Sequence, residues 1–482
     1  MVNGYQSLET SYFQGIKHIT IPISEVLNTK WNRFDANYFC TEGRIARIKI
    51  NKSKYDLISL NPSDKFVNRC FYPNRFKRIY VDEEFGLEFF LPSQINEIYP
   101  KPEKYISPKT EVDINELKVE KNCLLLTRSG TIGNLTYVSE TLAGKIFSDD
   151  VIRIFLQNPD DVGYIYAFLK SKIGQDILIT NNYGAVVQHI EPSHLSEIKI
   201  PNPPQNLRKQ IHNLISKSFK QRDEANGLIY EAESKLINEL NLPPLNQLTP
   251  ESFGNNNDIN SYIIHASNLQ NRFDGSFHTP IVAAIEKHLK KYAAKVALLG
   301  DENITKNIFL PGRFKRIYVE EGQGRKFIGS KQIGELNPVN TKYLSIFKHK
   351  DELGQLNLKE NMILVTRSGT IGNVKIVPKH WEKWVINEHV IRITPSSYRI
   401  AGYIYAWLDT PYGKELIKRF TFGSVVDEID VNNIASVQIP LLQKGQIQDE
   451  INTLILKSNQ LLYSAYLCEN EAIARITSEV LV

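Results

Sequence analysis

Residues 127–134 read Thr-Arg-Ser-Gly-Thr-Ile-Gly-Asn, and residues 366–373 repeat all eight. Three further segments recur in the same order and at nearly the same spacing: 32–35 with 271–274, 75–80 with 313–318, and 163–167 with 402–406. Solenoid repeats have periods of about 20–50 residues, so a repeat of this length is a duplicated domain. The sequence therefore predicts two copies of one module in a single chain, which suggests one task performed at two places on a partner.

The composition is that of an ordinary globular protein with a mild excess of positive charge. Hydrophobic residues make up 42% of the chain, and the net charge of +5 permits nucleic-acid binding without demonstrating it. The four cysteines are scattered and form no CxxC pair, which argues against a zinc site or a disulfide framework. Because no apolar run approaches the length of a membrane span and no signal-peptide pattern opens the chain, we expect a cytoplasmic protein without membrane contact.

Strand-like runs follow one another in the same order in both copies. Residues 124–127 and 363–366 are short apolar runs that end at a Ser-Gly turn, which is typical of a strand entering a turn. Residues 151–154 and 390–393 alternate in the manner of strands. Helix-like stretches begin at Gly163 and at Gly402, and we expect them to carry on through 172–174 and 412–414. Each module is therefore predicted to mix sheet and helix.

A long amphipathic helix is predicted after each module. Residues 206–240 contain no proline, their apolar residues recur mainly at steps of three and four, and Pro243-Pro244 ends the pattern. The end of the chain repeats this pattern. The residues expected to form the helix–helix contact are Ile211, Ile215, Ile229, Leu236, Ile451, Ile455, Leu462 and Ile476. A 35-residue helix is about 52 Å long, and an antiparallel pair would hold the two modules at opposite ends of a rigid spacer.

These observations predict an α+β fold, with two duplicated recognition domains separated by two long helices that form an antiparallel coiled coil. The expected boundaries are 1–205 for the first domain, 206–242 for the central helix, 243–445 for the second domain and 446–482 for the C-terminal helix. The copies differ between their shared motifs, and they would therefore recognise different features of a partner.

The ordered set of motifs resembles the specificity (S) subunit of type I restriction–modification enzymes, the HsdS family, over nearly the whole chain. The segments that carry the resemblance are the Asn-Arg-Phe-Asp lead-in, Arg-Phe-Lys-Arg-Ile-Tyr-Val, Thr-Arg-Ser-Gly-Thr-Ile-Gly, residues 183–187 and 422–426, and an Ile-Pro followed by a long helix. Each segment alone is a weak signal, whereas the same series present twice is specific.

The resemblance implies a non-catalytic subunit that binds double-stranded DNA. Each target recognition domain would recognise half of an asymmetric, bipartite site, and the coiled coil would fix the spacing between the half-sites. Methyltransferase subunits would dock on the helices and carry S-adenosylmethionine, and a restriction subunit would cleave the DNA. No cofactor or metal is expected on this chain.

Basic residues of the shared motifs are the candidate DNA contacts: Arg75, Lys77, Arg78, Arg128, Arg313, Lys315, Arg316 and Arg367. Cations around an aromatic residue suit phosphate contacts, and because both copies share them we expect contacts to the DNA backbone more than to bases. The alternative is a solvated segment repeated through common ancestry. Gly130, Gly133, Gly369 and Gly372 are interpreted as turn residues.

Two apparent catalytic features are rejected. Asn202-Pro203-Pro204-Gln205 is similar to the tetrad with which amino-methyltransferases hold a flipped base, but its fourth residue is not aromatic, so a linker is the better interpretation. Asp149-Asp150 and Glu388-His389 are interpreted as turn residues before a strand rather than as metal ligands. Two other functional hypotheses stay open, a self-contained DNA amino-methyltransferase and an adaptor that binds protein rather than DNA.

Overall fold

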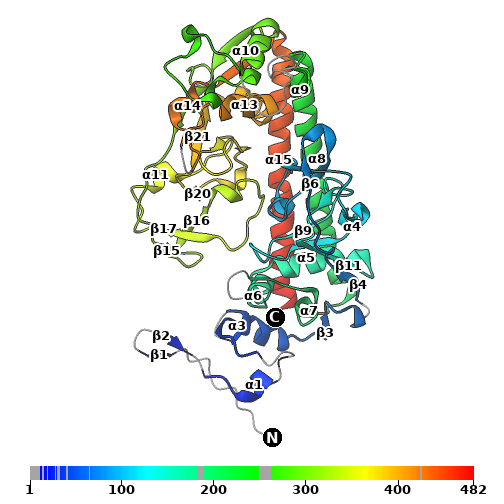
Figure 1. Ribbon diagram of the computed structural model, residues 1–482. Coiled ribbons are helices and arrows are strands. Elements are labelled where there is room, and N and C mark those ends of the chain that lie inside the picture. The colour runs from blue at the N-terminus through cyan, green and yellow to red at the C-terminus, as the bar shows by residue number, and fades with distance from the viewer. Residues whose placement is uncertain are drawn as a thin grey trace. The chain divides into compact units, whose positions relative to one another are not determined.

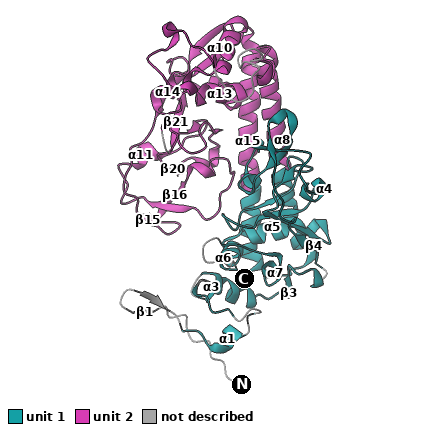
Figure 2. Cartoon of the chain, in the orientation of Figure 1, with its two compact units in different colours: residues 1–219, 468–482 teal, residues 220–467 magenta. Residues whose placement is uncertain are grey.

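The structure is a computed structural model that describes residues 11–13, 16–18, 20–27, 29, 33–39, 42–64, 66–181, 188–248, 262–423 and 426–481. The chain divides into two compact units (Figure 2). Unit 1 comprises residues 1–219 and 468–482, and unit 2 comprises residues 220–467. Several features named above lie outside the described residues: Asn32, Cys40, residues 183–187 and residues 424–425.

The described part of unit 1 contains two four-stranded sheets and two smaller pairs of strands. The antiparallel sheet has the order β4 (Val67–Phe71), β11 (Val151–Leu156), β8 (Leu124–Thr127), β9 (Leu135–Tyr137). The mixed sheet has the order β10 (Ile146–Phe147), β6 (Leu87–Phe90), β7 (Lys104–Ile106), β5 (Tyr80–Val81), with β10 parallel to β6. The pairs are β12 (Lys199–Pro201) with β3 (Leu57–Ser59), and β1 (Ser11–Phe13) with β2 (Ile16–His18).

The sheets of unit 2 repeat this topology. The antiparallel sheet has the order β14 (Thr305–Phe309), β21 (Val390–Pro395), β18 (Ile363–Thr366), β19 (Val374–Ile376). The mixed sheet has the order β15 (Tyr318–Val319), β17 (Lys342–Ser345), β16 (Gly324–Ile328), β20 (Val385–Ile386), and β13 (Lys295–Leu298) pairs with β22 (Gln438–Leu441). The domain duplication predicted from the repeats is therefore confirmed strand by strand.

Helices fill the space between and around the sheets in each unit. Those of unit 1, besides the long helices, are α1 (Ile23–Leu27), α2 (Ala36–Phe39), α3 (Glu42–Asn51), α4 (Ile114–Leu117), α5 (Val162–Lys170), α6 (Lys172–Thr180) and α7 (Pro192–Leu195). Those of unit 2 are α9 (Leu245–Leu248), α10 (Pro280–Tyr292), α11 (Leu353–Leu356), α12 (Tyr398–Asp409), α13 (Pro411–Lys418) and α14 (Val431–Ala435). None of the helices in the described ranges is both long enough and apolar enough to cross a membrane.

The run 124–126 is continuously apolar because β8 is buried on both faces. Leu124 and Leu126 pack in a core cluster with Ile152, whereas Leu125 packs in a second cluster with Val151. Successive side chains of a strand point to opposite faces, so each face of this sheet needs its own apolar set. The strand predictions at 124–127 and 151–154, and their counterparts β18 and β21, are confirmed.

The repeated octapeptide closes the hairpin between β8 and β9, and its second copy does the same between β18 and β19. Its glycines have positive φ angles: 76° at Gly130, 95° at Gly133, 77° at Gly369 and 81° at Gly372. Side chains with a Cβ rarely adopt this left-handed region. These four positions therefore explain locally why the turn sequence contains glycine.

The helix-like stretch after Gly163 is broken in two, contrary to the expectation of one continuous segment. Ser171 has an extended backbone, its C-terminal neighbour begins α6, and its hydroxyl accepts a hydrogen bond from the backbone N–H of Gly174 at 3.2 Å. Thr410 has the same role between α12 and α13, where its hydroxyl accepts a hydrogen bond from the backbone N–H of Gly413 at 3.0 Å. A Cβ added at Gly174 would lie 2.1 Å from the carbonyl oxygen of Phe168, so the corner depends on both the cap and the glycine.

The long helices are α8 (Gln205–Glu239) and α15 (Gly445–Arg475), the second followed by a π-helical turn, Ile476–Val480. Within unit 2 they run side by side (Figure 1) and antiparallel, because Gln221 contacts Ser464 whereas Glu239 contacts Lys444. In unit 1, Arg475 donates to Gln210 at 2.8 Å; in unit 2, Gln221 donates to Ser464 at 2.8 Å. The predicted antiparallel helix pair is confirmed. All eight predicted contact residues, from Ile211 to Ile476, are buried.

A glycine lets each unit's domain approach a long helix closely. The backbone N–H of Gly163 in α5 donates to His212 Nδ1 at 3.1 Å, and that of Gly402 in α12 donates to Asn452 Oδ1 at 2.8 Å. A Cβ at Gly402 would lie 2.6 Å from the carbonyl oxygen of Asn452. The repeated Gly-Tyr-Ile-Tyr-Ala segment is thus a docking element between a domain and the long helix that follows it.

Candidate nucleic-acid interface

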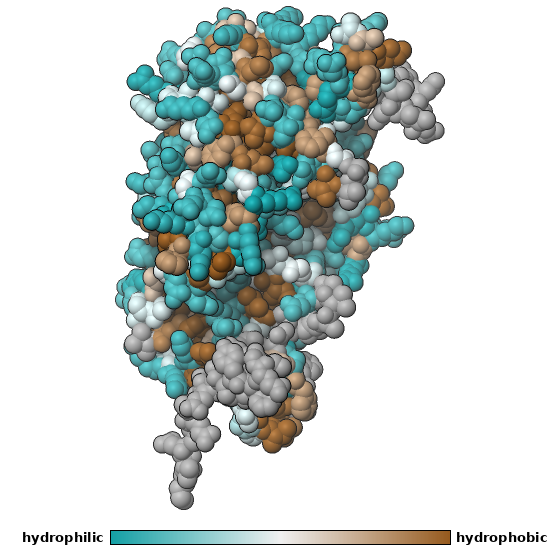
Figure 3. Space-filling model, turned by 90° about the vertical axis from the view of Figure 1, so that its left-hand side faces the viewer, coloured by the Kyte–Doolittle hydropathy of each residue, from teal (hydrophilic) through white to brown (hydrophobic). Residues whose placement is uncertain are grey.

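The surface drawn in Figure 3 is largely hydrophilic, with hydrophobic residues in small groups among the polar ones. Charged clusters on the two units are therefore the clearer guide to a contact with an anionic partner. The structure divides the predicted basic residues into cations that form no ion pair with a described residue and cations that already hold an acid.

Arg75 and Lys77 are exposed, and so are Arg313 and Lys315 at the matching places of unit 2. No ion pair connects any of these four side chains to another residue that the structure describes. The segment that carries them precedes β5 in unit 1 and β15 in unit 2, at the edge of the mixed sheet. Unpaired, solvated cations at matching places are suited to phosphate groups.

Arg78 differs from its two neighbours because it forms an ion pair with the buried carboxylate of Asp149. Arg316 forms the matching pair with Glu388 in unit 2. Burial by itself would lower the pKa of both guanidinium groups, but hydrogen bonds to the acid and to a neighbouring tyrosine, Tyr80 or Tyr318, raise it. These two arginines hold their loops against the sheet, and they are less available to DNA than Arg75 or Arg313.

Exposed tyrosines accompany the arginine–acid pairs. Tyr80 is 48% exposed and Tyr318 is 38% exposed. The ammonium of Lys104 lies 5.7 Å from the ring centre of Tyr80, and that of Lys342 lies 4.7 Å from the ring centre of Tyr318. Each unit thus presents the same alternation of cations and an aromatic ring, which is a common composition for contacts with nucleic acid.

Asp149-Asp150 and Glu388-His389 lie in turns before a strand, as the sequence predicted, but their side chains do more than close the turn. Asp149 and Glu388 neutralise the arginines described above, with side chains only 7% and 9% exposed. The sequence interpretation missed this role because the arginine lies about 70 residues away along the chain, a separation that no local pattern spans.

The arginines of the hairpin turn are also held by acids. Arg128 is buried, its Nη2 lies 2.6 Å from Glu191 and its Nη1 lies 3.3 Å from Asp150, and these contacts raise its pKa although burial opposes the charge. Arg367 Nη2 lies 2.6 Å from Glu428. The structure therefore places Arg128 and Arg367 as braces of the turn, apart from the exposed cations.

A cleft of about 400 Å³ in unit 1 brings several of these residues together. Its lining comprises Arg75, Phe76, Arg78, Leu91, Pro92, Ser129, Ser148, Asp149 and Asp150. The cleft combines an unpaired cation, an aromatic ring, a hydroxyl and two carboxylates, and so offers both donors and acceptors to a ligand. Of these, Ser129 and Asp150 were not among the predicted contact residues.

Two arginines were missed altogether because they occupy strand positions within apolar runs. Arg153 and Arg392 are fully buried, and no carboxylate forms an ion pair with either among the described residues. Arg153 donates to the carbonyl oxygens of Val151, Leu117 and Phe147 at 2.6, 3.0 and 3.1 Å. Burial lowers the pKa of Arg153 to about 10 and that of Arg392 to about 9. Their role is to connect the two sheets of each unit.

We expect Arg153→Lys to destabilise unit 1 by about 2–4 kcal/mol, because a lysine cannot reproduce the forked set of hydrogen bonds and leaves buried carbonyl groups unpaired. The matched control is Arg69→Lys on the adjacent strand β4, where the side chain is 48% exposed and pairs with Glu120. An exposed pair contributes about 0–1 kcal/mol. Urea unfolding of the two variants measures the difference, and equal losses would contradict the role given to Arg153.

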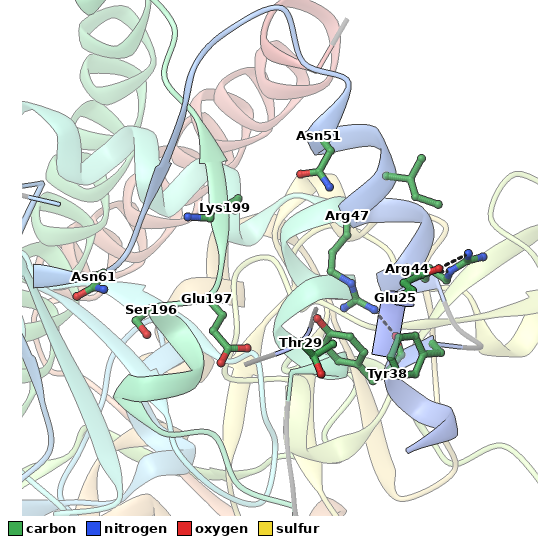
Figure 4. Close-up of a pocket in the computed structure, with 12 residues that line it drawn as sticks. Glu25, Thr29, Tyr38, Arg44, Arg47, Asn51, Asn61, Ser196, Glu197 and Lys199 are labelled. Carbon is green, nitrogen blue, oxygen red and sulfur yellow. Dashed lines mark hydrogen bonds and ion pairs between the residues drawn. The ribbon is translucent and has the colours of Figure 1, made fainter. Parts of the chain in front are cut away.

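The Asn-Arg-Phe-Asp motif forms a second arginine–aromatic assembly in each unit. Arg33 and Arg47 lie 4.5 and 3.7 Å from the ring centre of Tyr38. Arg47 and Tyr38 line the pocket drawn in Figure 4. In unit 2, Arg272 and Arg419 lie 4.7 and 4.3 Å from the ring centre of Phe277. In each unit, one arginine comes from the motif and the other from a helical region of the domain.

The second arginine of this assembly lies on a different helical segment in each unit, although the same two segments contact each other in both. Arg47 in α3 donates to Thr180 at the end of α6, at 3.4 Å. At the matching places of unit 2, Glu286 in α10 accepts from Arg419, which follows α13. The arginine therefore lies on the other side of this contact in unit 2, while both units keep an aromatic ring beside two cations.

The rejected catalytic features have structural roles. Asn202 lies between β12 and α8, where its backbone N–H donates to Asp56 O at 2.7 Å and its side chain accepts from Arg208. Within the described ranges, no group of three or more His, Cys, Asp or Glu side chains could hold a metal ion.

Three solved structures are similar over most of the chain. The S subunit of a type I restriction–modification system from M. genitalium is 15% identical, with 89% of this chain and 96% of that chain covered and a TM-score of 0.32. The HsdS subunit from Thermoanaerobacter tengcongensis is 12% identical, with 88% and 96% covered and a TM-score of 0.27. A chain from a study of complex assembly and conformational transition of the type I R-M system is 12% identical, with 87% and 97% covered and a TM-score of 0.26.

The sequence comparison with family models identifies the class. The model described as the type I restriction modification DNA specificity domain matches residues 78–234 and again residues 323–464, which together exceed half of the chain. The comparison with curated proteins gives no match. The chain belongs to the type I restriction–modification DNA specificity family, and its function is to supply DNA sequence specificity.

Proposed function

We propose that this chain recognises an asymmetric DNA site in two parts, with one duplicated domain for each half-site. The proposal rests on one observation: the two units have the same framework, but many of the side chains on that framework differ. The same strand order and the same arginine–acid pairs recur, while the residues between them differ. Two related domains that recognise different half-sites need the same backbone framework with different side chains on it.

The contact with the DNA backbone is assigned to Arg75, Lys77, Arg313 and Lys315. These side chains are exposed at matching places of both units, and phosphate contacts position a protein on the duplex without carrying sequence information. Arg78, Arg128, Arg316 and Arg367 are assigned a second role, because their acid partners leave them less free to meet phosphate. In this proposal they hold the loops that present the contact residues.

The chain acts as a scaffold rather than as an enzyme. Methyltransferase subunits dock on α8 and α15 and bind S-adenosylmethionine, and a restriction subunit joins the complex when DNA is cleaved. The long helices set the spacing between the half-sites, and the complex works in the cytoplasm. The domain boundaries at about residues 205 and 445 belong to the same proposal.

The test is the methylation pattern of the host genome with and without this chain, determined by long-read sequencing. We expect methyl marks at one asymmetric, two-part motif to disappear when the chain is removed and to return when it is restored. Marks that persist without the chain would refute the proposal. Methyl transfer by the purified chain alone would instead identify a self-contained methyltransferase.

We expect Arg75→Ala with Lys77→Ala to weaken the binding of the assembled complex to all DNA sequences by a similar factor. The slope of log K against log salt should fall by about two, because each lost phosphate contact contributes about 0.9. The matched control removes two exposed cations of unit 1 that already pair with acids, Lys121 and Lys172. A loss confined to one base of the site would assign the cluster to base recognition.

A further inference from the structure

We propose that Asp150 and His389 are specificity-determining residues, each of which contacts the edge of a base in its own half-site. The proposal rests on the proposed function and names the positions at which the two domains differ inside a shared frame. The two residues occupy the same place before the strands β11 and β21.

The frame around the two positions is the same in both units. The hydroxyl of Ser129 donates to Asp150, and Ser368 Oγ lies 2.8 Å from His389 Nδ1. Both serines come from the repeated octapeptide, whose backbone is fixed by its glycines. The backbone N–H of Arg128 donates to Asp150 O at 3.1 Å, and that of Arg367 donates to His389 O at 2.9 Å. The backbone at the two positions is therefore held in the same way.

The residues beside these positions cannot distinguish one half-site from another. Asp149 and Glu388 both carry a carboxylate, and each forms an ion pair with an arginine at a matching position, Arg78 or Arg316. Ser129 and Ser368 are the same residue. Position 150 or 389 is a place in this frame where the chemistry of the side chain changes; Ser148 also matches a different residue, Asn387, but both of these accept a hydrogen bond from the backbone N–H of Asp150 or His389.

The change alters what the side chain can recognise. An ionised aspartate accepts hydrogen bonds only, whereas a histidine ring both donates and accepts. In the major groove, a carboxylate suits the exocyclic amino group of cytosine or adenine, and a donor suits the N7 or O6 acceptors of a purine. In the tautomer in which Ser368 donates to Nδ1, the ring proton of His389 lies on Nε2, which can donate to such an acceptor. The two units therefore offer different hydrogen bonds to a base here: Asp150 accepts only, whereas His389 offers a donor in that tautomer.

Both side chains are accessible, unlike the acids next to them. The Asp150 side chain is 23% exposed and that of His389 is 35% exposed, against 7% for Asp149 and 9% for Glu388. Asp150 shares its cleft with the unpaired Arg75. A cation that grips phosphate and a carboxylate that faces a base edge are thus available within one cleft.

The test compares the methylation motifs produced by four full chains assembled with their methyltransferase partners: wild type, Asp150→Asn, Asp150→His and His389→Asp. We expect both substitutions at Asp150 to relax or change one base pair of one half-site, with discrimination at that position reduced about tenfold or more, and to leave the other half-site unchanged. His389→Asp should do the same in the other half-site.

Asp160→Asn is the matched control, because this exposed acid of unit 1 pairs with Lys209 away from the cleft. Asp150→Asn keeps the size and an acceptor for Ser129, so a normal melting temperature is expected. An unchanged motif in all variants would overturn the inference, and so would a uniform loss of methylation with the motif preserved, which would make Asp150 a brace for Arg128. A wild-type chain that produces no two-part motif would instead refute the proposed function.

Discussion

When the chain carries the second domain in both places, the complex assembled on it will methylate a site whose two halves are the same. Replacing residues 33–215 with residues 272–455 substitutes the whole domain together with the first turns of the following helix. Because the sheets have the same strand order in both units, the graft presents the same backbone framework to the helices. The first half-site should disappear and be replaced by a second copy of the other half-site.

The graft is designed so that two pairs important for packing move together. Gly402 brings its partner Asn452, and Arg419 brings Glu286. Long-read sequencing of a host that expresses only the chimera gives the motif directly. The matched control replaces residues 33–215 with themselves through the same joints. A motif that changes in both halves would contradict recognition by separate domains.

The substitution Gly402→Val will unfold or detach the domain of unit 2. Its Cβ would lie 2.6 Å from Asn452 O and 3.0 Å from the Cβ of Ile455, and neither the helix backbone nor a buried residue can move away cheaply. Overpacking of a tight site costs about 1–3 kcal/mol, and a clash with backbone puts this case at about 3 kcal/mol or more. Urea unfolding and protease sensitivity of unit 2 measure the loss.

Gly227→Ala is the matched control, because this glycine lies on the exposed face of α8 and a Cβ there meets nothing within 4 Å. Alanine is more favourable than glycine inside a helix by about 1 kcal/mol, so this variant should be more stable than the wild type. Similar losses for both variants would show that the close approach at Gly402 is not what holds the domain to its helix.

Much of the fold could be predicted because its signals are local or repeated. The runs 124–127 and 363–366 each have three apolar residues followed by a threonine, and both became buried central strands. The three-and-four spacing from Ile211 to Leu236 predicted the long helix and its buried face. The breaks at Ser171 and Thr410 were missed, because a single capping residue ends a helix while the apolar pattern continues.

The site was less predictable because its pairs connect distant segments. The sequence pattern singled out Arg78 as a cation, yet it could not show that Asp149 neutralises it. Arg153 looked like one polar position in a strand, and only the packed structure shows it reaching three carbonyl groups from inside the core. Both Arg75 and Arg78 are exposed, so the ion pair with Asp149 is what separates them, and that pair depends on tertiary packing that a basic tetrapeptide does not encode.

The exchanged arginine at the aromatic ring restricts how these domains can be recombined. A crossover anywhere between the positions of Arg47 and Thr180 produces one of two hybrids. One hybrid combines Arg47 with Arg419, which places two cations against each other. The other combines Glu286 with Thr180, which leaves the ring with only the cation from its motif. Neither hybrid keeps the assembly. Genetic reshuffling among copies of this kind should therefore inherit the stretch as one block, so that new specificities arise by exchanging whole domains, while changes within a domain accumulate one residue at a time.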